Sequence, residues 1–147
     1  MKTALTARTR LVLALFVAGL LTVSCGSDAP PTTPTLPIGP QTEVFTGTLQ
    51  VQGSNFYSFT VATQGSVNIT LASLLSARPG PALSTVVELA VGTPLGTECS
   101  VTNSVPAAPA LTAQLVNSLT PATYCTRIAD LGNLTGPVDF TVRIVHP

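Results

Sequence analysis

The strongest constraint on the fold is an alternation of apolar and polar residues with a period of two in the later part of the chain. It is clearest in VDFTVRIV, residues 138–145, where every second residue is apolar. FYSFTVAT at 56–63 and SVNITLASL at 66–74 follow the same pattern. This alternation is typical of strands with one buried face. No stretch after residue 30 carries a sustained apolar period of 3.6 with caps at both ends, so we expect no long helix.

Less regular segments complete the set of expected strands. The candidates are EVFTGTLQV, STVVELAV, ECSVT, LTAQLV and TYCTRIA. Gly, Pro and Asn mark the breaks between them, as in ARPGP, GTPLGT, VPAAPA, SLTPA and DLGNLTGP. Eight short strands predict an all-β antiparallel β-sandwich of jelly-roll type. The pattern leaves jelly-roll and immunoglobulin-like strand orders open, although the chain has no tryptophan for the Cys-Trp-Cys hallmark of the latter.

Residues 43–147 also resemble the bacterial pre-peptidase C-terminal domain. The likeness lies in a glycine-bearing first strand, a Y-x-F-x-V strand, a G-x-V-x-x-x-L segment and two closing strands. The matching residues are Gly47, Tyr57, Phe59, Val61, Gly65, Val67, Leu71, Tyr124, Phe140, Val142 and Ile144. The resemblance implies a jelly-roll accessory domain of the kind usually appended to secreted enzymes. No enzyme accompanies it in this sequence, so the usual helper role is not expected.

The N-terminus has the pattern of a secretion signal, assigned to residues 1–24. Lys2, Arg8 and Arg10 provide a positive start, and an uncharged stretch follows at 11–24. At 1.5 Å per residue that stretch covers about 21 Å, short of the roughly 30 Å hydrocarbon layer that a transmembrane helix crosses. We therefore expect cleavage.

Thr22, Val23, Ser24 and Cys25 resemble a bacterial lipobox, which implies that Cys25 is acylated and tethers the chain to membrane lipid. The alternative is an ordinary signal peptide that leaves Cys25 as a free thiol. The following Pro/Thr-rich residues, 25–42, have no hydrophobic periodicity and predict a linker before a domain at 43–147. Gly26 stands where an aspartate would signal inner-membrane retention, so the resemblance favours the outer membrane of a two-membrane bacterium.

Lipidation of Cys25 leaves Cys99 and Cys125 in an exported domain, where we expect a disulfide. Closing a loop of this length contributes about 3.5 kcal/mol in the chain-entropy account. A metal site is the competing interpretation, but two sulfurs and one distant histidine fall short of a tetrahedral ligand set.

Catalytic groups are scarce in the mature chain, which contains no lysine. His146 is the only histidine, lies one residue from the end and has no nucleophile motif beside it, so we expect it at the exposed end of the last strand. The carboxylates beyond the linker are scattered, with no spacing that singles out a catalytic pair. They are Glu43, Glu88, Glu98, Asp130 and Asp139. We expect no enzyme and no cofactor.

ADLGNLTGPVD is the sharpest polar cluster, and Asp130, Asn133 and Asp139 there are candidate calcium ligands. The stronger interpretation is a tight turn, with Asp130 bonding backbone amides and Gly132 or Asn133 at positive φ.

With Lys2, Arg8 and Arg10 removed, three arginines remain against six acidic residues, a formal charge of −3, which excludes nucleic-acid binding. Phe56 is the one aromatic residue that the strand pattern places off the inward face, so it is the candidate for stacking on a sugar. The predicted function is a membrane-tethered, non-catalytic β-sandwich module of the bacterial cell envelope, with a structural role or an envelope protein as partner. The alternative is a lectin-like module that binds a glycan or calcium.

Overall fold

A computed structural model describes residues 39–77 and 80–147 as a β-sandwich, which confirms the predicted fold class. Neither range contains a helix, and so no helix among these residues is long and apolar enough to cross a membrane. The strands are β1 (Gln41–Leu49), β2 (Ser54–Val61), β3 (Gly65–Ser76), β4 (Val87–Leu95), β5 (Glu98–Ala107), β6 (Leu115–Leu119), β7 (Ala122–Ala129) and β8 (Val138–His146).

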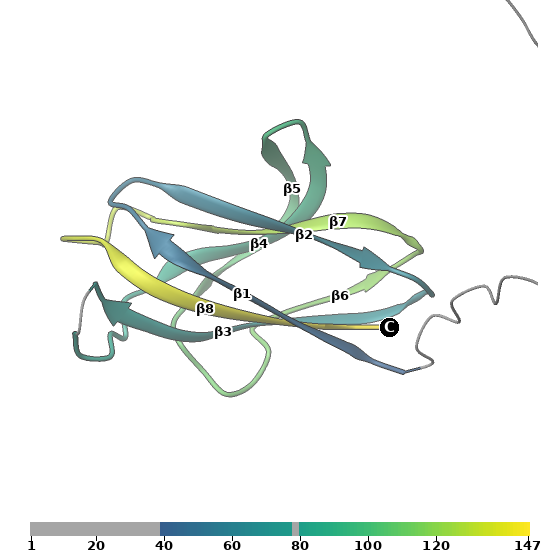
Figure 1. Ribbon diagram of the computed structural model, residues 1–147, viewed down its shortest axis with the longest axis horizontal. Helices are drawn as coiled ribbons and strands as arrows, with labels where there is room; N and C mark the ends of the chain where they lie inside the picture. The colour runs from purple at the N-terminus through teal and green to yellow at the C-terminus, as the bar shows by residue number, and fades with distance from the viewer. Residues whose placement is uncertain (1–38, 78–79) are drawn as a thin grey trace, which may run out of the picture. The chain divides into compact units, whose positions relative to one another are not determined.

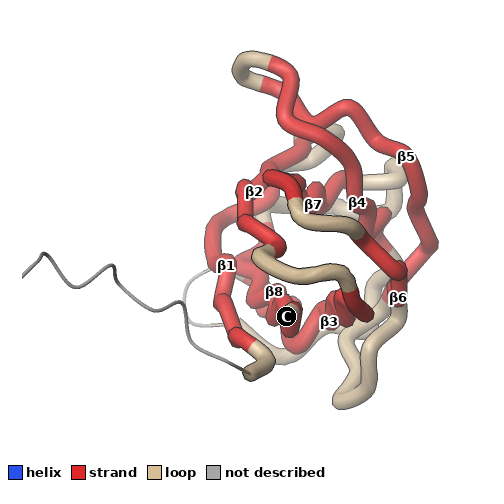
Figure 2. The backbone as a smooth tube through the Cα atoms, turned by 90° about the vertical axis from the view of Figure 1, so that its right-hand side faces the viewer, coloured by secondary structure: helices blue, strands red, loops and turns tan. Residues whose placement is uncertain are grey.

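The strands form two four-stranded sheets with the orders β1-β8-β3-β6 and β2-β7-β4-β5. Every neighbouring pair is antiparallel. Successive strands alternate between the two sheets except at β4 and β5, and this is the strand order of a jelly roll. It settles the choice between jelly-roll and immunoglobulin-like orders that the sequence pattern left open. Figure 2 shows the two sheets as separate layers.

The core lies between the sheets and follows the predicted alternation. In β8, Val138, Phe140, Val142 and Ile144 are all buried, while Arg143 is exposed. In β3 the alternation shifts phase, because a bulge between Leu71 and Ser73 changes the register with β8. Leu74 therefore joins Leu71 in the core, and no single period of two describes the whole strand.

Some strand ends differ from the prediction. The first strand begins at Gln41, inside the expected linker. Strand β4 runs through most of the expected break GTPLGT, because the chain reverses in a two-residue turn where Gly96 has a φ of 60°. Strand β6 begins only at Leu115, because the residue before it does not pair with β3 as a regular strand residue. The Gln114 backbone amide donates to the Ile69 carbonyl, and the Gln114 side chain accepts from the Leu71 amide.

Candidate functional site

The β4–β5 hairpin leaves its sheet at a bulge. The register shifts between Val91 and Gly92, and the hydroxyl of Thr102 donates a hydrogen bond of 3.1 Å to the Val91 carbonyl. Only glycine fits at position 92, because a Cβ there would lie 1.9 Å from the carbonyl oxygen of Ser100. Beyond the bulge the hairpin stands out from the sandwich (Figure 1).

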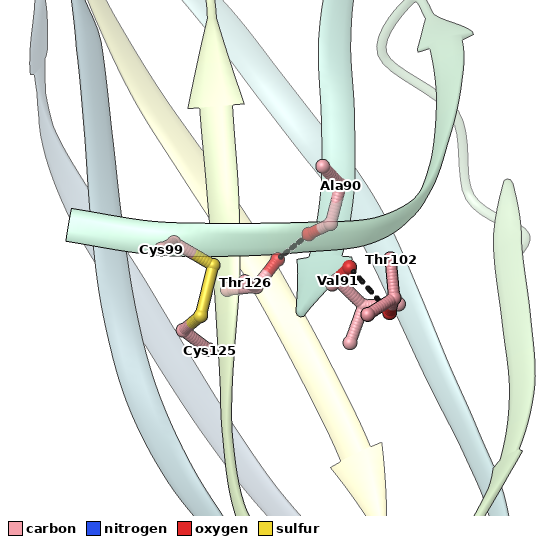
Figure 3. Close-up of a disulfide and its surroundings, with 6 residues drawn as sticks. All are labelled: Ala90, Val91, Cys99, Thr102, Cys125 and Thr126. Carbon is pink, nitrogen blue, oxygen red and sulfur yellow. Dashed lines mark hydrogen bonds between the residues drawn. A yellow bond between two sulfur atoms is a disulfide. The ribbon is translucent and has the colours of Figure 1, made fainter. Parts of the chain in front are cut away.

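The predicted disulfide between Cys99 and Cys125 is present, with an S–S distance of 2.03 Å and Cα atoms 5.9 Å apart. It joins β5 to β7, which are not neighbours in the sheet because β4 lies between them. Figure 3 shows β5 crossing β7 at this bond. Cys125 alternates along β7 with the core-facing Tyr124 and Thr126, so the disulfide holds the hairpin against the outer face of the sheet.

A groove of about 450 Å³ lies between the hairpin and strands β2 and β7. On its sheet side, Phe56 of β2 stands opposite Arg127 of β7 in the strand register, and both side chains are half-buried. Thr97 and Glu98 line it from the hairpin. Its lining is mainly polar, so we take it as the candidate site and call it the hairpin groove.

Two polar groups of the hairpin groove have no partner among the described residues. Arg127 donates through Nη2 to the carboxylate of Glu88 on β4, but its Nε is buried without an acceptor. The exposed carboxylate of Glu98 makes no hydrogen bond or ion pair within residues 39–77 and 80–147. The groove thus has one exposed acceptor without a protein partner, whereas the Arg127 Nε is sealed from solvent.

A second polar cluster joins the two sheets at the β1 and β2 edge. Glu43 accepts a hydrogen bond of 2.5 Å from the Tyr57 hydroxyl on Oε2, and its Oε1 lies 2.9 Å from His146 Nε2. His146 Nδ1 lies 3.1 Å from the carbonyl oxygen of Pro147. The hydrogen bond to Glu43 raises the pKa of Tyr57 above 10.0, with burial and the negative charge of Glu43 as smaller causes.

The expectation that His146 is exposed is wrong, because the residue is 3% exposed. His146 continues the inward series of Phe140, Val142 and Ile144, and β1 and β3 cover β8 on both sides. Two mainly apolar grooves, of about 480 and 550 Å³, open beside it. Both of its ring nitrogens are engaged, so neither is free to activate a hydroxyl as a general base.

Asp130 forms the turn that the sequence analysis favoured over a calcium site. Its Oδ1 accepts from the amides of Gly132 and Asn133 at 2.9 Å and of Leu134 at 3.2 Å, and its Oδ2 accepts from the Gln52 amide at 2.8 Å. Gly132 has a φ of 86°. The Gln52 amide is the largest cause that lowers the pKa of Asp130 below 3.8, and the amides of the loop add to it.

The three candidate calcium ligands bond to different parts of the protein. Asn133 donates through Nδ2 to the Val86 carbonyl at 3.0 Å, and Asp139 accepts a hydrogen bond of 2.6 Å from the Thr48 hydroxyl. Both oxygens of Asp130 are taken by amides. Across the part of the chain that the structure describes, no three His, Cys, Asp or Glu side chains gather closely enough to hold a metal ion.

Residues 1–24 and Cys25 lie outside the described residues, so the predicted signal and lipidation site stay predictions. Sequence reasoning identified Phe56 but missed Glu98 and Arg127, because only the folded hairpin brings these side chains together with Phe56. The one local signal was the glycine and proline content of GTPLGT, which marks a hairpin without showing where it folds. No protein-family model matches this chain, and a search of curated proteins finds no significant match.

Proposed function

We propose that this chain is a lipid-anchored module of the bacterial cell envelope that acts by binding and not by catalysis. In this proposal residues 1–24 direct export, an acylated Cys25 holds the chain to membrane lipid, and residues 25–42 link it to the sandwich. The outer membrane is its place in a bacterium with two membranes. The resemblance to the pre-peptidase C-terminal domain belongs to the same proposal.

The disulfide is the observation that supports export. Such bonds form and persist in oxidising compartments outside the cytosol. A buried pair, with Cys99 at 7% and Cys125 at 0% exposure, fits a domain that folds after export. The third cysteine, Cys25, stands in the lipobox-like segment, where acylation would remove its free thiol.

The hydrogen bonding of the polar side chains supports binding over catalysis. Glu43 and His146 bond to each other, Glu88 bonds to Arg127, and Asp130 is occupied by amides. Such groups hold strands and turns in place and are not poised to act on a substrate. An envelope protein is the partner that we propose.

Metabolic labelling with a clickable fatty acid tests the anchor. We expect label in the membrane fraction on a chain that lacks residues 1–24, and loss of label in Cys25→Ser. The matched control is the double variant Cys99→Ser/Cys125→Ser, which removes the other two cysteines and keeps the label. An unlabelled full-length chain in the cytosol, with its signal still attached, would overturn the proposal.

Crosslinking in intact cells followed by pulldown tests the partner. The anchored chain should capture an envelope protein reproducibly, and Cys25→Ser should reduce the capture because the chain leaves the membrane. Absence of any captured envelope protein under several growth conditions would argue against an interaction role.

A ligand-binding module is the second candidate, and the hairpin groove is the observation that favours it. Its size of about 450 Å³ falls within the roughly 300–1,000 Å³ usual for small-molecule sites. Calorimetry with calcium tests the metal form of this candidate, and a heat signal that saturates at one ion per chain would support it. The saccharide form is developed below.

A further inference from the structure

The hairpin groove contains an exposed carboxylate that has no partner among the described residues. The Glu98 carboxylate and the Arg127 Nε have no partners among the described residues. The cluster of Glu43, Tyr57 and His146 contrasts with it, because its polar atoms satisfy one another. The Arg127 Nε is buried and closed to a ligand, so the exposed Glu98 carboxylate is the group that a ligand in the groove can reach.

Phe56 adds an aromatic surface to these polar groups. It lies half-buried on the outer side of β2, opposite Arg127. The other phenylalanines and tyrosines in residues 39–77 and 80–147 lie in the core or pack against it; these are Phe45, Tyr57, Phe59, Tyr124 and Phe140. Phe56 therefore stands apart, and it lines the same groove as the Glu98 carboxylate.

Charge narrows the ligand class. Glu88 neutralises Arg127, and Glu98 leaves the neighbourhood with one net negative charge, which disfavours phosphate, sulfate and acidic sugars. A hydroxyl group donates a hydrogen bond to a carboxylate without adding charge, so a neutral molecule with neighbouring hydroxyls suits Glu98. A molecule with such hydroxyls and an apolar C–H face that fits an aromatic ring is a sugar.

We propose that the hairpin groove binds a neutral saccharide. One sugar ring lies against Phe56, and its neighbouring hydroxyls donate to the Glu98 carboxylate. Glu98 follows the two-residue turn and directly precedes Cys99, so the disulfide positions it over the sheet. The inference names a ligand class for the proposed envelope module. It rests on that proposal only for the expectation that the protein meets the sugar at the cell envelope.

Calorimetric titration of the purified full chain tests the inference. The probes are neutral oligosaccharides derived from cellulose, starch, mannan and chitin. We expect at least one of them to bind, and Phe56→Ala to weaken that binding about tenfold or more. Glu98→Gln removes the charged acceptor and weakens it by about threefold to tenfold.

Control variants separate loss of the site from loss of the fold. Phe56→Tyr keeps the ring and keeps binding, whereas Phe56→Leu keeps apolar bulk and loses binding. Val116→Ala trims an exposed apolar side chain on β6 of the other sheet and leaves the affinity unchanged. Urea unfolding of each variant shows whether the fold is intact. Reduction of the disulfide weakens binding because it releases the strand that carries Glu98.

Three results would overturn the proposal. The first is that no neutral oligosaccharide binds the wild-type chain at concentrations up to about 10 mM. The second is binding that neither Phe56→Ala nor Glu98→Gln changes. The third is binding restricted to acidic sugars. All three leave the labelling test of Cys25 unaffected, so failure of this inference and failure of the envelope proposal are distinguishable.

Discussion

The β4–β5 hairpin and the β7–β8 loop are both connections that local sequence marks as turns, yet different chemistry holds each in place. The hairpin is held by one covalent bond between Cys99 and Cys125. The loop is held by Asp130, whose two oxygens accept from four backbone amides, including that of Gln52 in the β1–β2 turn. The hairpin should therefore respond to reductant, and the loop to acid.

The largest expected effect concerns the hairpin. Reduction of the disulfide, or Cys99→Ala/Cys125→Ala, should lower the free energy of unfolding by about 3.5 kcal/mol, because the unfolded chain loses its cross-link. Urea unfolding with and without reductant measures this difference at neutral pH. Cys25→Ser is the control and should not change it. A loss below about 1 kcal/mol would show that the hairpin is held mainly by other contacts.

The bulge that turns the hairpin out of its sheet is expected to be the next most sensitive point. Gly92→Ala places a Cβ 1.9 Å from the Ser100 carbonyl oxygen, so the backbone must move. We expect a loss of about 2–3 kcal/mol in the free energy of unfolding. Gly136→Ala is the matched control, because its Cβ meets nothing within 4 Å. Equal stability of the two variants would contradict the geometry of the bulge.

A smaller effect is expected at Asp130, and this effect depends on pH and not on reductant. Its folded-state pKa is lowered, so its contribution to stability is present above the unfolded pKa of about 3.9 and is lost as the pH falls through the folded pKa. Asp130→Asn should therefore be less stable than the wild type at neutral pH, and the difference should shrink in acid. Reductant should leave this difference unchanged.

Urea unfolding from neutral pH down to about pH 2.5 measures the Asp130 effect. Glu98→Gln controls for the change in net charge, because Glu98 has no partner among the described residues. A difference between Asp130→Asn and the wild type that stays constant over this range would show that the carboxylate charge does not hold the loop.

The smallest effect is expected at Gln52, which the Asp130 carboxylate holds at a φ of 56°. A non-glycine residue in this left-handed region costs roughly 1–2 kcal/mol. Glycine removes that strain, but it also raises the conformational entropy of the unfolded chain, which offsets part of the gain in stability. Gln52→Gly should therefore raise the free energy of unfolding by about 0.5–1 kcal/mol. Gln50→Gly, at an ordinary φ in the same connection, should lower it. The opposite order would show that Gln52 is not strained.

Local patterns predicted the strands, their buried faces and the Asp130 turn, because each depends on residues close together in the chain. Val138 to Ile144 alternate in sequence as they do in the core. His146 belongs to the same series, so extending the alternation by one step would have placed it inside. Its place one residue from the end argued for exposure instead, and the Glu43 carboxylate that makes burial tolerable comes from the first strand.

The hairpin groove is different, because Phe56, Glu98 and Arg127 come from three strands with no shared local signal. Their meeting depends on the Val91/Gly92 bulge, which bends the hairpin, and on the disulfide, which positions it. A register shift of this kind arises from pairing between strands and leaves little trace in either strand alone.

By itself, the sequence determined that this chain forms a sandwich of eight strands with the apolar side chains facing inward, because a period of two and the turn residues act within a few positions. It also indicated the pairing of Cys99 and Cys125. Only the tertiary structure decided the jelly-roll strand order, the burial of His146 against Glu43 and the groove beneath the hairpin. These depend on which distant strands pair and in what register, and the free energy that selects one pairing belongs to the assembled core and not to any segment.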